Sequence, residues 1–470
     1  MFLIIFSTIL LILNIYCLFT KKYIYLIFPC ILFLPEYYGM EITNSLPLIT
    51  VSRLMLTIFF MYAFINRKKT IDYIDIFHTL PKTYIFLFSY FFFRIVSNCY
   101  YITIYRQSIT AIFSIIFEQL CPIIAVFLLQ PTKEQTTTII KTTVYSASAL
   151  FAIGILESYT RIRPFDSLYT VQREMLNEHY IRLGLYRATT SLGLPVFYGN
   201  MCIIILPLIL FLYSYYKEKK YLFILLLNLF ATIHSGSRAD IIFFITIIGL
   251  YFIIRLILND NTVLFLRNII IILSLSIFIM TSLSFTNKYA KYFYEGTFQS
   301  VLNEFGFSFD VEKSAPSGTD GFGTNKHGVS SRTFQFTGVQ YAFSKNPLFG
   351  LGAGALENNQ VYYNGWGEWT PYHSYDMGIV EVLISEGLLG FTGYLCFFIF
   401  ICGIMIPHLK TIRNSPPSTA ITLLPFVYLL STLSTANMHS FMIFIAIIFI
   451  LYFYMPIIGD STRCNLLEKN

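Results

Sequence analysis

The chain has 470 residues, of which 56% are hydrophobic and only 12% are charged, and its formal net charge is +7. Its mean hydropathy is +0.65, whereas ordinary soluble domains carry about 25% charged residues. A soluble protein of this size has no interior large enough to hide so much apolar surface. The composition therefore excludes a secreted enzyme, a cytosolic enzyme and a disordered scaffold, and it predicts an all-α polytopic transmembrane bundle.

Apolar runs along the chain predict about 12 to 13 transmembrane spans, because about 20 apolar residues cross a bilayer. In chain order they lie near 2–20, 23–35, 48–65, 83–101, 109–130, 136–156, 191–215, 221–234, 241–258, 268–285, 378–406, 420–436 and 440–458. The first run lacks a basic start and a small-residue cleavage site, so we expect a span and not a signal peptide.

The runs divide the chain into three predicted parts. Residues 1–285 form an N-terminal bundle of ten spans, with a loop at 157–190. Residues 286–377 form a large loop subdomain, and residues 378–470 hold the C-terminal spans.

Lys and Arg in short loops predict the orientation of the bundle, because they stay on the cytoplasmic side. If successive spans cross the membrane in alternating directions, the basic loops all fall on one side. These loops hold Lys21–Lys22, Arg67–Lys69, Lys133, Lys217–Lys220, Arg255 with Arg267, Lys410 with Arg413, and Arg463 with Lys469. The loops 157–190 and 286–377 then face outward. Both carry several basic residues, which fits either an anionic substrate or plain solubility.

The large outer loop contains several predicted elements. Lys288–Phe305 has aromatic residues at helical spacing and is expected to lie on the membrane surface. The segment 310–328 is rich in Gly, Ser, Thr and Asn, which is typical of a lid or linker. A helix is predicted from Ser330–Ser331 to Asn346–Pro347, with Arg332 in its first turn, and a tight glycine turn follows at Gly350–Gly354.

Two residues near the predicted outer edge can do chemistry. His373 lies in a polar, aromatic loop just before a span, where it can act as a general base near neutral pH or simply hydrogen-bond the loop. Arg238 lies between two spans and must reach water, pair or hold an anion, since it cannot lose its charge. Asp240 is a poor partner because residues two apart do not share a helix face. Ser235 and Ser237 can offer hydroxyl and N–H groups to a phosphate at the next helix start.

Other polar residues interrupt apolar runs. Arg53, Arg94, Glu118 and Lys141 are expected either to form interior pairs or to line a cavity. The run 191–215 carries Gly and Pro residues and predicts a broken or kinked helix.

Several motifs are absent from the sequence. There is no GxxxxGK[ST], no HExxH, no CxxC and no cluster at metal-ligand spacing. We therefore expect no cofactor and no metal, and a reaction that uses a pre-activated donor.

Three ordered segments carry a resemblance to a known family. They are Ser235–Arg238, then Ser331–Arg332 with Phe343–Gly354, then His373–Ser374 with Ser385–Gly390; the stretch Arg187–Asn200 matches more loosely. Over about residues 190–390 the chain resembles the bacterial O-antigen polymerase and O-antigen ligase superfamily. The family pattern has Asn after the histidine, whereas this chain has Ser374, which keeps a hydroxyl for hydrogen bonding.

The resemblance implies a metal-independent, inverting glycosyltransferase in the bacterial inner membrane, with its active site facing the periplasm. Its partners would be an undecaprenyl-pyrophosphate-linked glycan donor, a saccharide acceptor, membrane lipid and, as a candidate, a chain-length regulator protein, with no nucleic acid. Arg238 and Arg332 resemble the arginines that hold the pyrophosphate, and His373 resembles the histidine that prepares the acceptor hydroxyl. Arg187, Ser237, Gly352, Gly354 and Ser374 are the expected substrate-binding residues.

Displacing pyrophosphate builds negative charge, which fixed guanidinium groups stabilise when no metal is used. A polysaccharide polymerase for O-antigen or capsule is the first hypothesis; an O-antigen ligase and a protein O-oligosaccharyltransferase are the alternatives within the superfamily. A lipid-linked glycan transporter is the alternative from another class, with Arg94, Glu118 and Lys141 along its path.

Overall fold

The computed structural model describes residues 2–41, 48–67, 83–171, 180–257, 262–311, 316, 329–365, 367–372, 374–375, 377–412 and 420–434. Within them the chain is an all-α polytopic membrane protein with three short β-hairpins. In these described ranges, six helices are long and apolar enough to cross a bilayer, and three shorter apolar helices join them. The last predicted span, 440–458, and most of the predicted lid lie outside the described residues.

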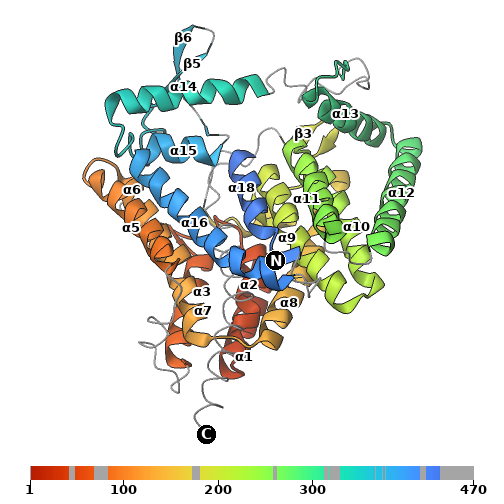
Figure 1. The fold of residues 1–470 in the computed structure, drawn as a ribbon, viewed down its shortest axis with the longest axis horizontal. Helices are drawn as coiled ribbons and strands as arrows, with labels where there is room; N and C mark the ends of the chain where they lie inside the picture. Colours follow the sequence, from red (N-terminus) through yellow and green to blue (C-terminus); the bar gives the residue numbers. More distant parts are fainter. Residues whose placement is uncertain are drawn as a thin grey trace.

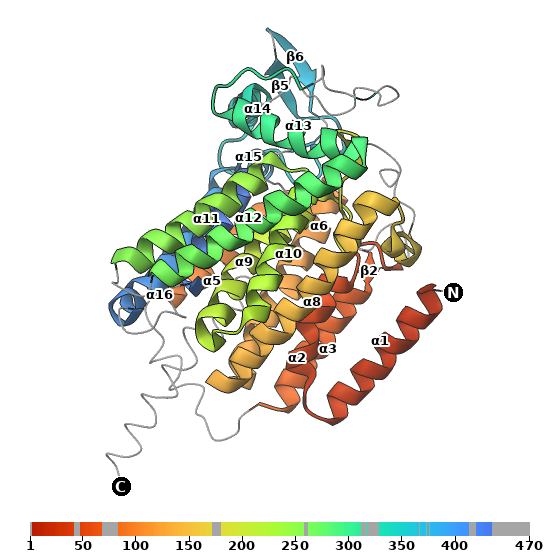
Figure 2. The ribbon, with the colours of Figure 1, turned by 90° about the vertical axis from the view of Figure 1, so that its right-hand side faces the viewer.

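The N-terminal half is a series of packed helices (Figure 1). Their bounds are α1 Phe2–Phe19, α2 Tyr23–Phe33, α3 Val51–Ile65, α5 Tyr84–Tyr100, α6 Arg106–Phe113, η1 Ser114–Leu120, α7 Cys121–Leu129 and α8 Lys133–Thr160. A capping box starts α8, since Thr132 and Gln135 bond each other's backbone N–H groups. α1 stands at the side of the bundle, where Figure 2 shows it apart from the other helices.

The middle of the chain holds the most enclosed helix. The bounds here are α9 Pro195–Tyr216, α10 Lys219–His234, α11 Arg238–Ile257 and α12 Thr262–Thr286. In α9, 89% of the span window is buried, against 6% in α1, so α9 forms the centre of the core. α9 is continuous across Pro207; the predicted break lies before it, because Gly193 (φ +74°) ends a 3-10 turn and Pro195 begins the helix.

The end of the bundle that carries α13 Lys288–Glu304 and α14 Val329–Lys345 is called the loop end below (top of Figure 1). α13 and α14 confirm the two helices expected in the large loop. The hairpin β5 Tyr362–Gly365 and β6 Glu368–Pro371 packs on α14. Two smaller hairpins pair β1 Gly39–Met40 with β2 Ile49–Thr50 and β3 Ile181–Arg182 with β4 Leu185–Tyr186.

The apolar run 378–406 is two helices and not one. α15 Gly378–Ser385 ends at Glu386, and α16 Gly387–Ile412 starts with Gly387 at φ +66°, a backbone conformation that favours glycine. α16 then packs along α5, and α18 Leu424–Ser434 contacts α9 and α16. The bend lets α15 lie across the loop end while α16 enters the bundle.

Candidate functional site

Three arginines gather around the turn Ser235–Ser237, which joins α10 to α11 at the loop end. Arg187 Nε donates to the Ser235 carbonyl at 2.8 Å, and Arg182 Nη1 donates to the Gly236 carbonyl at 2.6 Å. Arg238 begins α11. These three residues are called the arginine cluster below, and together they present guanidinium groups from β3, the end of β4 and the start of α11.

Gly236 is required for this close approach. Its φ is +64°, and a Cβ at this position would lie 3.0 Å from Arg187 Nε and 3.1 Å from Arg187 Cγ. A larger residue would therefore be strained in its backbone and would push Arg187 away. The glycine in the Ser-Gly-Ser-Arg motif is explained by this contact.

The arginine cluster has more positive than negative charge. Arg238 Nη1 lies 2.7 Å from Glu304 Oε1 of α13. Burial, then the nearby Arg187 and Arg238, lower the pKa of Arg182. The pKa of Arg187 is also lowered, mainly by burial, although Asp240 opposes the shift. Among the described residues, three guanidinium groups thus face two carboxylates, and an anion at this place would relieve the imbalance.

Asp240 does not bond Arg238, which agrees with the expectation from helix spacing. It is fully buried against α9, where a Cβ on Gly199 would come within 2.0 Å of its Oδ2. Gly199 therefore makes room for a carboxylate of α11. This contact accounts for one of the small residues in the run 191–215.

The other two predicted catalytic residues are only partly described. Arg332 lies in the first turn of α14, and its side chain is outside the described residues. The opposite end of α14 is anchored on α5, where Asn346 Nδ2 donates to Tyr101 Oη at 3.2 Å. The first turn therefore points away from α5, towards α13 and α11 (Figure 1). That Arg332 joins the arginine cluster remains a prediction.

His373 also lies outside the described residues. Of the residues beside it, Tyr372 is buried and Ser374 is exposed between β6 and α15. Tyr375 and Glu381 follow and line a cavity at the loop end. The roles of His373 and Ser374 stay predictions.

The glycine turn of the second motif interlocks with the third motif. Leu351 N donates to the Ile384 carbonyl at 2.8 Å, and Gly352 N donates to the Ser385 carbonyl at 3.0 Å. In return Leu388 N donates to the Pro347 carbonyl at 3.0 Å. The two separated motifs form one unit that positions α15.

The turn glycines also face the junction between α5 and α6 and the first turn of α6. A Cβ on Gly352 would lie 2.8 Å from the Tyr101 and Tyr105 rings, and one on Gly354 would lie 2.6 Å from Gln107 Oε1. Both glycines therefore have a packing role. Their predicted contact with substrate stays a prediction.

A buried ion pair fastens this unit to α5. Arg94 donates from Nη2 to Glu386 Oε1 at 2.6 Å and from Nε to Oε2 at 2.9 Å. Both side chains are nearly inaccessible to solvent, with 2% and 6% exposed. Arg94 also donates to Tyr90 Oη at 2.9 Å. Arg94, one of the polar residues that interrupt apolar runs, therefore forms an interior ion pair with Glu386.

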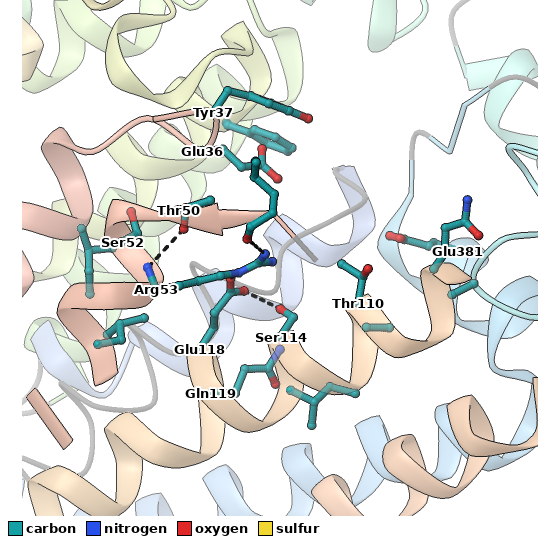
Figure 3. A pocket seen from close by; sticks show the side chains of 18 of the residues that line it. Glu36, Tyr37, Thr50, Ser52, Arg53, Thr110, Ser114, Glu118, Gln119 and Glu381 are labelled. Atoms are coloured by element: carbon teal, nitrogen blue, oxygen red, sulfur yellow. Dashed lines mark hydrogen bonds and ion pairs between the residues drawn. The ribbon is translucent and has the colours of Figure 1, made fainter. Parts of the chain in front are cut away.

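The remaining interrupting residues are also accounted for. Arg53 Nε of α3 donates to Glu118 Oε1 of η1 at 2.5 Å, and Lys141 Nζ lies 5.3 Å from the centroid of the Tyr216 ring. Arg53 and Glu118 line the cavity already mentioned, and Figure 3 shows their contact together with the bond from Ser114 to Glu118.

Sequence reasoning missed Arg182 and Glu304 as site residues and missed η1 entirely. Arg182 was one of several loop arginines, and nothing in the sequence separates it from the others. The π-helical turn depends on i+5 hydrogen bonds, and no residue pattern marks them. Across the described ranges, no group of three or more His, Cys, Asp or Glu could hold a metal ion.

Comparison with known proteins gives one match. A family model described as O-antigen ligase matches residues 221–395, from α10 into α16. The matched residues contain Arg238, Arg332, the glycine turn and the α15–α16 junction. No curated protein and no solved structure matches the chain.

Proposed function

We propose that this protein transfers a glycan from a lipid pyrophosphate to a saccharide hydroxyl, starting from the match of residues 221–395 to a family model described as O-antigen ligase. The observation that carries the proposal is the arginine cluster, where three guanidinium groups face two carboxylates in the part of the chain that the structure describes. Such a cluster is suited to a diphosphate because guanidinium groups bind phosphate oxygens in pairs.

The chemistry follows from this binding. The acceptor oxygen attacks the anomeric carbon of the donor, the bond to the pyrophosphate oxygen breaks, and the proton of the hydroxyl passes to a base. One displacement inverts the anomeric centre. Fixed arginines would stabilise the charge that grows on the leaving group, and neutral His373 is proposed to accept the proton.

The proposed setting is the outer face of the bacterial inner membrane, with an undecaprenyl-pyrophosphate-linked glycan as donor. The loop end would face the periplasm. A polysaccharide polymerase is our first hypothesis, with a second lipid-linked repeat as acceptor, and a ligase that uses lipid A-core is the alternative. A chain-length regulator would act only with the polymerase.

Arginine variants test the diphosphate assignment. Arg238→Ala and Arg332→Ala should abolish the polymer while the protein stays in the membrane, and Arg332→Lys should also fail because it loses the paired contact. His373→Ala should lose activity as well. Normal polymer from both arginine variants would refute the assignment. A fully active His373→Ala enzyme would remove the proposed base.

The cellular phenotype separates the two acceptors. If long glycan is lost and single repeats stay attached to lipid A-core, the protein is a polymerase. If all attachment is lost, it is a ligase. Turnover of a lipid-linked substrate by purified protein would exclude a transporter.

A further inference from the structure

Backbone hydrogen bonds hold the chain on both sides of the Arg187 side chain. Arg187 N donates to the Tyr180 carbonyl at 2.6 Å, and Ala188 N donates to the His234 carbonyl at 2.9 Å. The bond from Arg187 Nε to the Ser235 carbonyl lies beside them. The direction of the Arg187 guanidinium group therefore depends on the exact course of this backbone.

A buried carboxylate continues this anchoring from another helix. Glu157 of α8 accepts at Oε2 from Thr189 N at 3.1 Å and from Thr190 N at 2.9 Å. All three residues are buried, with at most 1% of their surface exposed. If this acceptor were removed, two buried N–H groups would lose their partner, which costs free energy. Glu157 thus stabilises one particular course of the chain just after Arg187.

The backbone at the two threonines needs such a support. Thr190 has φ +48°, a conformation that β-branched residues rarely adopt, and Thr189 before it has φ −127° and ψ −35°. A residue of negative φ followed by one of positive φ can turn two successive N–H groups towards one anion. Here the Glu157 carboxylate takes the place of that anion. A strained backbone persists only where its surroundings hold it, so loss of Glu157 would let this segment relax.

α8 is a firm base for this contact. It packs on β4, on the 3-10 turn η4 Thr190–Leu192 and on α10 (Figure 2). Arg187 is therefore supported from two directions, since the turn at Gly236 accepts its side chain and Glu157 holds the backbone that follows it.

We propose that Glu157 is a positioning residue for the transfer, and that it keeps the Arg187 guanidinium group directed at the place where the diphosphate binds. The proposal rests on the proposed function and deepens it, because Glu157 lies outside the residues 221–395 that match the family model. Since Glu157 acts through Arg187, its effect on diphosphate binding should vanish in a protein that lacks the Arg187 side chain.

Arginine side-chain NMR on the isotope-labelled full chain in detergent reports the position of Arg187 without any ligand. Its Nε–H signal is assigned with Arg187→Lys. Glu157→Ala should shift or broaden this signal, and so should Glu157→Asp, which keeps the charge but is shorter by one methylene. Glu157→Gln should preserve it, because an amide oxygen accepts from the same two N–H groups. An unchanged signal in Glu157→Ala or, if that variant does not fold, in Glu157→Asp would overturn the proposal.

A double-mutant cycle separates positioning from general stability. Arg187→Ala and Glu157→Ala should each weaken the binding of polyprenyl pyrophosphate at least about tenfold, the loss expected for a hydrogen bond to a charged group. The combined variant should bind no more than about twofold more weakly than Arg187→Ala alone, because the two residues act as one unit. A combined loss of about a hundredfold would mean that the two effects are independent, and it would overturn the proposal.

Thr132→Ala is the matched control at the opposite end of α8. It removes the capping box and should lower the thermal stability. The 28 residues of α8 span about 42 Å, so neither the Arg187 signal nor the affinity for polyprenyl pyrophosphate should change. If Thr132→Ala weakens binding as much as Glu157→Ala does, the effect is general destabilisation and the proposal is wrong.

The same measurements distinguish this proposal from the proposed function. Full affinity for polyprenyl pyrophosphate in both Arg187→Ala and Arg238→Ala would refute the proposed function, while a shifted Arg187 signal in Glu157→Ala would still establish the anchoring. Lost affinity in both arginine variants, with an unchanged Arg187 signal and full affinity in Glu157→Ala, would refute the positioning role alone.

Discussion

The buried pair between Arg94 and Glu386 should be a strong determinant of stability. Glu386→Gln keeps the shape of the side chain but leaves the Arg94 guanidinium charge uncompensated among groups that are nearly inaccessible to solvent. Removing one partner of a buried pair costs about 3–5 kcal/mol. Two direct bonds from Arg94 and a third from Asn98 at 3.3 Å depend on this carboxylate.

Reversible unfolding in mixed detergent micelles can measure this loss through a double-mutant cycle with Arg94→Met, Glu386→Gln and the combined variant. We expect the combined variant to be more stable than Glu386→Gln alone, since it removes the buried charge. Glu218→Gln is the matched control, because its pair with Lys220 is exposed and solvent screens it, so its loss should have little effect on stability. Equal losses for Glu386→Gln and Glu218→Gln, or a coupling energy near zero, would refute the reasoning.

The remaining predictions concern the arginine cluster and the chemistry. Gly236→Ala should abolish transfer because its Cβ would displace Arg187. Gly306→Ala is the control: its φ is also positive, but its Cβ would meet open space, so it should cost about 1–2 kcal/mol of stability and leave transfer intact. If both variants are inactive in an assay of purified protein, the contact between Gly236 and Arg187 does not have the proposed role. Glu304→Gln removes the carboxylate beside Arg238, so lipid pyrophosphate should bind more tightly in a direct binding assay; weaker binding would count against a site for anions. A chelator should leave transfer unchanged, and inhibition that a divalent ion reverses would argue for a metal.

The interlocked motifs join elements that are far apart in sequence. The glycine turn bonds the α15–α16 junction through backbone groups, and Glu386 of that junction bonds Arg94 of α5. The loop that carries His373 therefore begins at a hairpin packed on α14 and ends on a helix fixed to α5.

The sequence by itself determined the class of fold, most helices and the order of the motifs. Hydropathy and helical periodicity are local properties, so α8, α11, α13 and α14 could be predicted from neighbouring residues. The sequence also indicated Arg238 as a candidate site residue, because a permanent charge at the edge of a span must reach water, form a pair or hold an anion.

Only the tertiary structure decided which residues meet. Arg94 and Glu386 are 292 positions apart, and Arg182 reaches Gly236 across 54 positions; no local pattern encodes either contact. The cavity beside η1 likewise exists only because α3, η1 and α15 come together. Charge and burial at these places depend on packing between distant segments, and packing is a property of the folded chain as a whole.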